Sequence, residues 1–321
     1  MEQPEAMGSS ATPGAERDEQ VSAASAPTTA HDALAPRACT TCGTPTTVGG
    51  GVTTATNGPP TALAVSAGFV YAIGRIEARF PRLSVEKEFA QVAAQVDTKG
   101  LTDRQALQTV LSEPGNRYLA RQMCWVMMIE GMETYILLPR DSADVSLLVE
   151  TLRASPAPSD LDVVIGIKGP IAPPEMCNGL LVPAVAVDQV YSFDRAALIQ
   201  AIPKPEKIPA KEFAPAAEEL FDRIMQMTDN AGAMDEHRAL NYLAMRYHRI
   251  YEAVSGAHAQ NESLSAVDVI PSLLSGTRKV VDVIFSFTNR NTDVVSKQFV
   301  RVDVSEEFPF LVTKLSPYYD R

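Results

Sequence analysis

The pattern of hydrophobic and polar positions predicts almost no structure before residue 67, and strands mixed with helices after it. Residues 1–66 are mainly Ala, Thr, Ser, Gly and Pro, with scattered Val, Leu and Met and no aromatic residue. Such a segment buries too little apolar surface to offset the entropy that it would lose on ordering. We therefore predict a disordered tail or linker over 1–66.

Ordered structure is expected to begin near Phe69, where FVYAIGRI has the aromatic and β-branched residues typical of a strand. Apolar residues at helical spacing follow in 83–96, and Thr102 is a candidate N-cap for a second helix. Two apolar runs around Glu130-Gly131 favour a β-hairpin, although the methionines also permit a helix in the first run. Asp141 can cap a third helix.

The apolar pattern then changes from strands to helices. Segments 161–169 and 180–193 are nearly continuous apolar runs, as in strands buried on both faces. Helical spacing follows in 194–202, 211–227 and 235–254, and the last two segments resemble a helical hairpin. Alternation returns in three segments, 278–290, 292–305 and 308–316. These final segments predict an antiparallel meander.

Together these patterns predict an α+β fold, with mixed or antiparallel sheets and packed helices behind the tail. The Pro- and Lys-rich linker at 203–210 divides the folded residues into an α+β domain over 67–202 and a C-terminal domain over 203–321. The C-terminal domain is expected to combine the helical hairpin with the antiparallel strands.

Composition narrows the functional classes. The 321 residues carry a net charge of −11, which argues against nucleic acid and anionic membranes as partners. The N-terminus lacks the pattern of a signal peptide, and no apolar run reaches the roughly 18 residues of a membrane span. Cys124 and Cys177 lie in apolar stretches, where we expect reduced thiols, and the cytoplasm is the expected compartment.

Cys39 and Cys42 form a C-x-x-C motif, which can place two thiolates on one Zn²⁺ ion. A closed zinc site needs four ligands, and the sequence has no second pair at a matching spacing. Cys177 or His237 could supply distant ligands. The alternative is a flexible dithiol in the tail.

Two groups of charged residues are candidates for binding a peptide or a partner. Arg75, Glu77 and Arg79 alternate with apolar residues, so they could bind a peptide terminus, or they could protect an edge strand from aggregation.

The second group, Asp235, His237 and Arg238, lies at the start of a predicted helix. His237 could act as a catalytic base there, but Asp235 as an N-cap of an exposed helix explains the same pattern.

The sequence contains no G-T-S-x-A or H-G-T-H segment, no G-x-S-x-G elbow, no G-x-x-x-x-G-K-[ST] loop and no G-x-G-x-x-G. Serine hydrolysis, nucleotide hydrolysis and dinucleotide redox chemistry therefore lack their usual sequence signals. No catalytic residue can be assigned, which favours an interaction module over an enzyme.

Several long segments resemble a known family. They are YAIGRIEARFPRLSVEKEFAQ, NRYLARQMCWVMMIEGMETYILLPRD, VVIGIKGPIAPPEMCNGL, FAPAAEELFDRIMQMTDNAGAMDEHRALNYLAMRY and FVRVDVSEEFPFLVTKLSPYYDR. Over about Phe69–Arg321 the chain resembles the region C-terminal to the subtilisin-like protease domain in cyanobactin maturation proteases of the PatA/PatG type. The chain lacks the Ser-His-Asp protease domain of that family, so no catalytic residue carries over.

The resemblance implies a non-catalytic accessory module in the maturation of ribosomally made, post-translationally modified peptides. Its expected partners are a precursor or modified peptide and a separate subtilisin-like protease. Two alternatives stay open: a metal-dependent enzyme using Cys and His ligands, and a structural domain that dimerises to organise a separate protease.

Overall fold

The structure is a computed structural model that describes residues 68–319 except 97, 203–209 and 227–228. The chain divides into two compact units, Met1–Ala62 and Leu63–Arg321, and every described residue belongs to the second. The predicted tail, and most of the predicted linker at 203–210, lie outside the described residues. The predicted α+β class is confirmed, whereas the proposed domain boundary near 202 stays a prediction.

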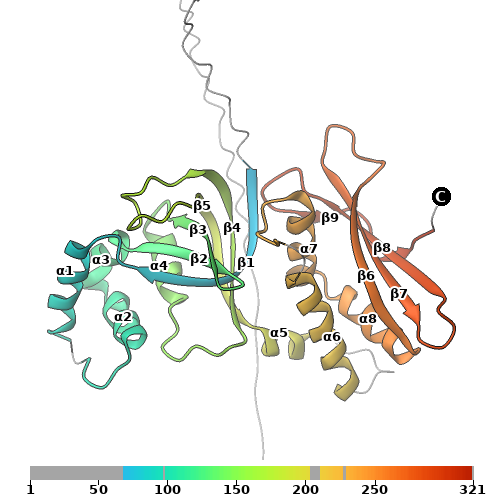
Figure 1. Ribbon diagram of the computed structural model, residues 1–321, viewed down its shortest axis with the longest axis horizontal. Helices are drawn as coiled ribbons and strands as arrows, with labels where there is room; N and C mark the ends of the chain where they lie inside the picture. The colour runs from blue at the N-terminus through green and yellow to red at the C-terminus, as the bar shows by residue number, and fades with distance from the viewer. Residues whose placement is uncertain (1–67, 97, 203–209, 227–228, 320–321) are drawn as a thin grey trace, which may run out of the picture. The chain divides into compact units, whose positions relative to one another are not determined.

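The N-terminal part of the described chain is a closed five-stranded barrel with the order β1-β2-β3-β5-β4 (Figure 1). Neighbouring strands are antiparallel except for β3 and β5, which are parallel. The strands are β1 (Gly68–Arg79), β2 (Cys124–Ile129), β3 (Met132–Leu138), β4 (Asp160–Ile171) and β5 (Pro183–Asp194). The predicted hairpin is confirmed, with Glu130 and Gly131 both at positive φ between β2 and β3.

Strand β1 changes its partner half-way along its length. Residues 68–74 pair with β4, whereas residues 75–79 pair with β2. Gly74 lies at this change, and a Cβ atom there would be 2.2 Å from the carbonyl oxygen of Met128. A glycine therefore permits the close approach of β1 and β2. The edge-strand interpretation of Arg75, Glu77 and Arg79 stays open, because residues 75–79 have β2 as their one described strand partner, although β1 as a whole lies between β2 and β4.

One face of the barrel strands shares a core with four helices. Val70, Ala72 and Ile76 alternate along β1 and join this core, as period-two alternation requires. The helices are α1 (Leu83–Ala93), α2 (Asp103–Ser112), α3 (Arg117–Gln122) and α4 (Ser142–Glu150), with a 3₁₀ turn at Pro114–Asn116. The predicted caps are confirmed, since Thr102 and Asp141 each form a capping box. Helix α3 had not been predicted.

A disulfide joins Cys124 of β2 to Cys177 in the β4–β5 connection, with the Cα atoms 5.6 Å apart. The expectation of two reduced thiols is therefore wrong. Both cysteines lie among apolar residues, as predicted, but the sequence does not show that the 172–182 connection folds back against the outer face of β2. This Cα separation is within the usual range for disulfides.

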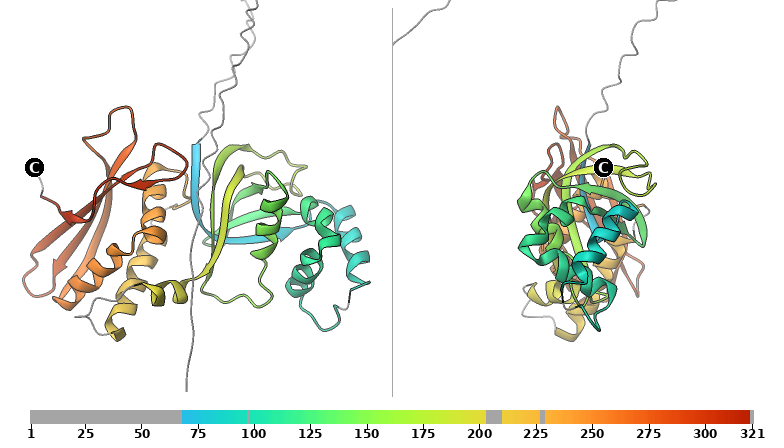
Figure 2. Two further views of the ribbon diagram at one scale, coloured as in Figure 1. Left: turned by 180° about the vertical axis from the view of Figure 1, so that it is seen from behind. Right: turned by 90° about the vertical axis from the view of Figure 1, so that its left-hand side faces the viewer.

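The C-terminal part combines four helices with an antiparallel sheet of order β10-β8-β7-β6, in which β9 pairs with β8. Helices α6, α7 and α8 lie on one side of the sheet, where they share its largest core (Figures 1 and 2). The helices are α5 (Arg195–Ala201), α6 (Ala210–Met225), α7 (Asp235–Arg246) and α8 (Arg249–Ala259). The strands are β6 (Glu262–Pro271), β7 (Val280–Asn289), β8 (Val295–Asp303), β9 (Phe310–Leu311) and β10 (Ser316–Pro317).

Two predictions for this part are wrong in detail. The single helix expected over 235–254 is broken at Tyr247, which leaves the helical conformation and accepts a hydrogen bond from the Leu315 amide at its hydroxyl (3.0 Å). The long strand expected over 308–316 is reduced to β9 and the start of β10. Pro309 and Pro317 lack the amide hydrogen that a longer ladder would need.

The segment before α7 contacts the main chain of β1. The Tyr71 amide donates to the Gly232 carbonyl (2.8 Å), and the Asn241 side chain donates to the Tyr71 carbonyl (2.8 Å). Asn230 and Asn241 also exchange two hydrogen bonds with each other. The polar groups of β1 that face away from β4 at Tyr71 are thus satisfied by the C-terminal part of the chain.

No helix of the described chain has the length and apolar character needed to cross a lipid bilayer.

Candidate functional site

At the charged end of β1, some side chains form ion pairs with carboxylates and one does not among the described residues. Arg79 forms ion pairs with Glu77 (3.0 Å) and with Glu133 of β3 (2.5 Å). Arg75 is exposed, and its Nη2 donates to the Pro158 carbonyl (2.5 Å). Among the described residues Arg75 has no carboxylate partner, so its charge is available to a ligand.

Arg75 and Glu77 line a cavity of about 400 Å³ between the barrel and helices α5 and α6. Its walls include apolar side chains from β1, β2, β4 and α6, and charged side chains from the β2–β3 turn and α5. The Arg195–Asp222 ion pair, which joins α5 to α6, belongs to this lining. The cavity therefore combines an apolar wall with charged groups at its rim.

The same two residues, Arg75 and Glu77, also line a smaller cavity of about 110 Å³ on the side of α2 and the 151–162 segment. Arg104 and Arg153 contribute two further guanidinium groups there. Arg153 forms an ion pair with Asp160, whereas the Nε of Arg104 donates to the Arg153 carbonyl (3.2 Å).

Asp162 forms the buried wall of this smaller cavity. Its carboxylate accepts from the Ile76 amide (2.8 Å) and from the Ser192 hydroxyl. Burial raises the pKa of Asp162 despite these hydrogen bonds and the nearby Arg153 and Arg104. The carboxylate is therefore less fully ionised than an exposed one would be.

Sequence reasoning found Arg75, Glu77 and Arg79 as a group but missed Arg104, Arg153 and Arg195. These three arginines lie outside β1 in the sequence, and each belongs to an ordinary helix or loop pattern. Only the closure of the barrel and the position of α5 bring them to the same cavities.

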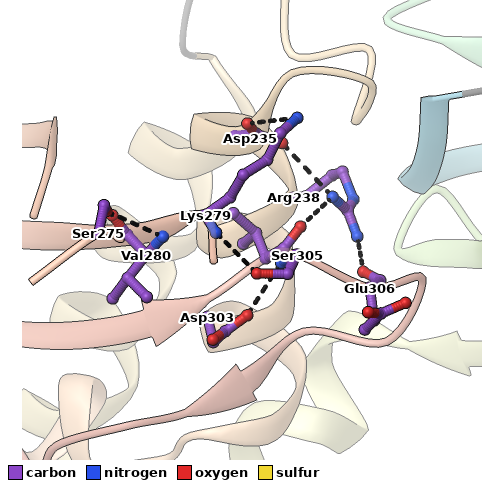
Figure 3. A network of polar contacts seen from close by, with 9 residues as sticks. Asp235, Arg238, Ser275, Lys279, Val280, Asp303, Ser305 and Glu306 are labelled. Carbon is purple, nitrogen blue, oxygen red and sulfur yellow. Dashed lines mark hydrogen bonds and ion pairs between the residues drawn. The ribbon is translucent and has the colours of Figure 1, made fainter. Parts of the chain in front are cut away.

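Arg238 of the second predicted group is buried, with 2% of its surface exposed. Its guanidinium donates to the carbonyls of Val304 (2.7 Å), Glu306 and Glu307 (3.2 Å) and lies over the Phe69 ring. Figure 3 shows Arg238 extending from α7 to the segment that follows β8. Its donors are largely used inside the chain.

Asp235 and His237 precede Arg238 at the start of α7, and their side chains form no described hydrogen bond with each other. Met234, not Asp235, is the N-cap of α7, so the predicted cap is wrong. Asp235 lies in the first turn instead and contacts Arg238 (3.5 Å) and Lys279 (3.1 Å) (Figure 3).

His237 is 4% exposed, and its Nδ1 atom has no hydrogen-bond partner within the described structure. Burial lowers the pKa of His237 and favours the neutral ring. A catalytic base needs a partner that orients the ring, and none is present among the described residues.

Two of the predicted metal ligands, Cys177 and His237, lie among the described residues. Cys39 and Cys42 lie outside the described residues, and Cys177 is bonded to Cys124. Within the described part of the chain, no three His, Cys, Asp or Glu side chains are grouped closely enough to hold a metal ion. A zinc site at Cys39 and Cys42 stays a prediction.

A pair of carboxyl groups joins the barrel to the segment after β8. Burial, and then the hydrogen bond to Asp188 of β5, raise the pKa of Glu307 to about 7. Arg140 forms an ion pair with Asp188 and partly offsets the repulsion between the two carboxylates. Glu307 is therefore expected to change its charge near neutral pH.

Comparisons with known proteins give one family. The PatG Domain family matches residues 69–271, which is more than half of the 321-residue chain. A solved structure described as "PatG Domain of Unknown Function" is similar in fold, with a TM-score of 0.63 and 20% sequence identity over 78% of this chain and 99% of that chain. No curated protein matches the chain.

The family match begins at the second residue of β1, includes the whole barrel, and ends at the last residue of β6. The cavities around Arg75 lie within it. This chain therefore belongs to the PatG Domain family.

Proposed function

We propose that this chain is a non-catalytic accessory module in the maturation of ribosomally made, cyanobactin-like peptides, and that it binds a precursor peptide or a partner protease. Membership of the PatG Domain family and the resemblance to the region beside a maturation protease support the pathway. The observation that supports binding is the open edge of the C-terminal sheet at β6.

Strand β6 is ten residues long and ends the strand order β10-β8-β7-β6. Among the described strands β7 is its one partner. Arg223 donates to the Ser265 carbonyl (2.9 Å), but no described side chain forms a hydrogen bond with the main chain over 266–271. This part of the edge leaves backbone donors and acceptors free for another strand.

The last residues of β6 and the turn after it expose apolar side chains. Ile270 is 39% exposed, and Leu273 and Leu274 in the following turn are 92% and 67% exposed. Edge strands that avoid pairing often carry charge, proline or a bulge. Strand β6 has the exposed Asp268, Pro271 at its end and a bulge between Leu264 and Ala266, so the stretch open to pairing lies between the bulge and Pro271. An extended peptide can add to such an edge through main-chain hydrogen bonds, with its side chains providing specificity.

Calorimetric titration of the protein with leader, core and cyclised precursor peptides, and with a separate subtilisin-like protease, tests the proposal. We expect binding of at least one of these partners. A precursor peptide that pairs with β6 should lose affinity when alternate backbone amides are N-methylated, because methylation removes the donors that strand pairing needs.

A matched pair of variants locates the binding. Ile270→Lys adds a charge beside the edge and should weaken peptide binding, whereas Leu83→Lys, at a 62% exposed position on α1, should not. No heat change with any peptide or with the protease would show that the proposed function is wrong.

A further inference from the structure

The cavities on the two sides of Arg75 adjoin, because Arg75 and Glu77 belong to the lining of both. The larger cavity, at about 400 Å³, falls within the size range of small-ligand sites, roughly 300–1,000 Å³. Its apolar wall is formed by Ile73, Met128, Leu161, Phe221 and Met225. This wall suits one apolar side chain with a short length of main chain.

The smaller cavity differs in its charge. Most acids around the two cavities already have a basic partner: Glu77 with Arg79, Asp160 with Arg153, and Asp222 with Arg195. Two guanidinium groups, Arg75 and Arg104, have no ion-pair partner among the described residues, although Arg104 interacts at longer range with Asp162. Asp162 is buried and already accepts two hydrogen bonds.

The positions of the remaining charged groups indicate which end of the site would bind a carboxylate. Arg75 and Arg104 both line the smaller cavity. Guanidinium groups bind carboxylates through charge-assisted hydrogen bonds. Glu130 lies at the rim of the larger cavity, is exposed, and has no described ion-pair partner. It would repel a carboxylate at that end.

We propose that these adjoining cavities bind the C-terminus of a peptide whose last residue is apolar. The carboxylate lies between Arg75 and Arg104, and the last side chain lies against the apolar wall next to Phe221 and Met225. This site goes beyond the proposed pairing at β6, since a precursor peptide can bind the sheet edge without its C-terminus reaching Arg75.

The test uses two short probes, acetyl-Ala-Ala-Leu with a free C-terminal carboxylate and the same peptide as its amide. Binding to the full chain is followed by ¹H–¹⁵N NMR, which also reports whether each variant is folded. We expect the free acid to bind at least tenfold more tightly than the amide, because charge-assisted hydrogen bonds are lost in the amide. A free-acid peptide ending in glycine should bind several-fold more weakly than the leucine peptide.

Variants of Arg75 and Arg104 test whether these two arginines cause the preference for the free acid over the amide. Arg75→Gln and Arg104→Gln should each weaken binding of the free acid at least fivefold, and the double variant should bind acid and amide equally. Arg249→Gln is the matched control, because Arg249 is an exposed arginine on α8 and is not part of either cavity.

Three outcomes would overturn the proposed carboxylate site: equal affinity for acid and amide, unchanged free-acid binding in the double variant, or no binding of the free acid at about 10 mM, roughly tenfold above a dissociation constant of 1 mM. Failure of this site is distinguishable from failure of the proposed function, because precursor binding that is lost on N-methylation of the peptide depends on β6 and not on the two arginines.

Discussion

Replacing Arg238 with methionine separates a structural role for this side chain from the binding role that its sequence context suggested. Methionine keeps much of the apolar stem but removes every donor. The Val304 carbonyl then loses a charged donor at 2.7 Å in a buried position, which costs about 1–3 kcal/mol. Loss of the contact with the Phe69 ring adds about 0.5–2 kcal/mol.

Two effects reduce this cost. The Glu306 and Glu307 carbonyls are in a partly exposed segment, where water can replace the lost donor. Burial lowers the pKa of Arg238, and its Nε has no hydrogen-bond partner, so the variant also avoids the desolvation of a charged group. We expect the free energy of unfolding to fall by about 1–4 kcal/mol.

Urea unfolding followed by circular dichroism measures this change. With a slope of about 2 kcal/mol/M, the midpoint should fall by about 0.5–2 M. Arg249→Met, at an exposed arginine on α8, is the control and should change the unfolding free energy by less than about 0.5 kcal/mol. A loss below about 1 kcal/mol in the Arg238 variant, together with lost peptide binding, would refute the structural role and restore the binding interpretation.

Three further predictions concern the carboxyl pair, the disulfide and the loop before α7. Because the pKa of Glu307 is about 7 in the folded chain and 4.5 as an isolated group, its contribution to stability should be complete below about pH 4.5 and be lost as the pH rises through 7. Glu307→Gln should remove this part of the pH dependence of the urea midpoint; an unchanged pH profile would contradict the assignment. The Cys124–Cys177 bond spans a sequence separation of 53, so replacing both cysteines with alanine should lower the unfolding free energy by about 2–4 kcal/mol and abolish the effect of reductant on the midpoint. Equal midpoints with and without reductant in the parent protein would argue against the bond. Gly232→Ala places a Cβ atom 2.2 Å from the main chain of β1 at a φ of +70°, so its thermal midpoint should fall by several degrees, whereas Gly256→Ala on α8, with open space around its Cα, should not lower it.

The sequence alone determined most of the local structure. The aromatic and β-branched residues of FVYAIGRI predict β1, Thr102 and Asp141 predict the starts of α2 and α4, and the Glu130-Gly131 dipeptide predicts the turn between β2 and β3. Each of these features depends on contacts within a few residues, through side-chain caps, turn conformations or the two-residue period of a strand. Local patterns are therefore sufficient to predict them.

Contacts between distant segments decided the rest. The break at Tyr247 accompanies a hydrogen bond to Leu315, and the disulfide depends on a connection that folds back over β2. The buried state of Arg238 depends on three carbonyls more than 60 residues away in the sequence.

The candidate carboxylate site has the same origin. Sequence alternation identified Arg75 as a possible ligand for a peptide terminus, but Arg104 reaches the same cavity only because the barrel closes and α2 packs beside the 151–162 segment. Ion pairing then distinguishes Arg75 and Arg104 from Arg79, Arg153 and Arg195, whose charges are already matched by acids. Which arginine can bind a ligand depends on its distances to acidic groups in the folded chain. The spacing of residues along the sequence does not reveal these distances.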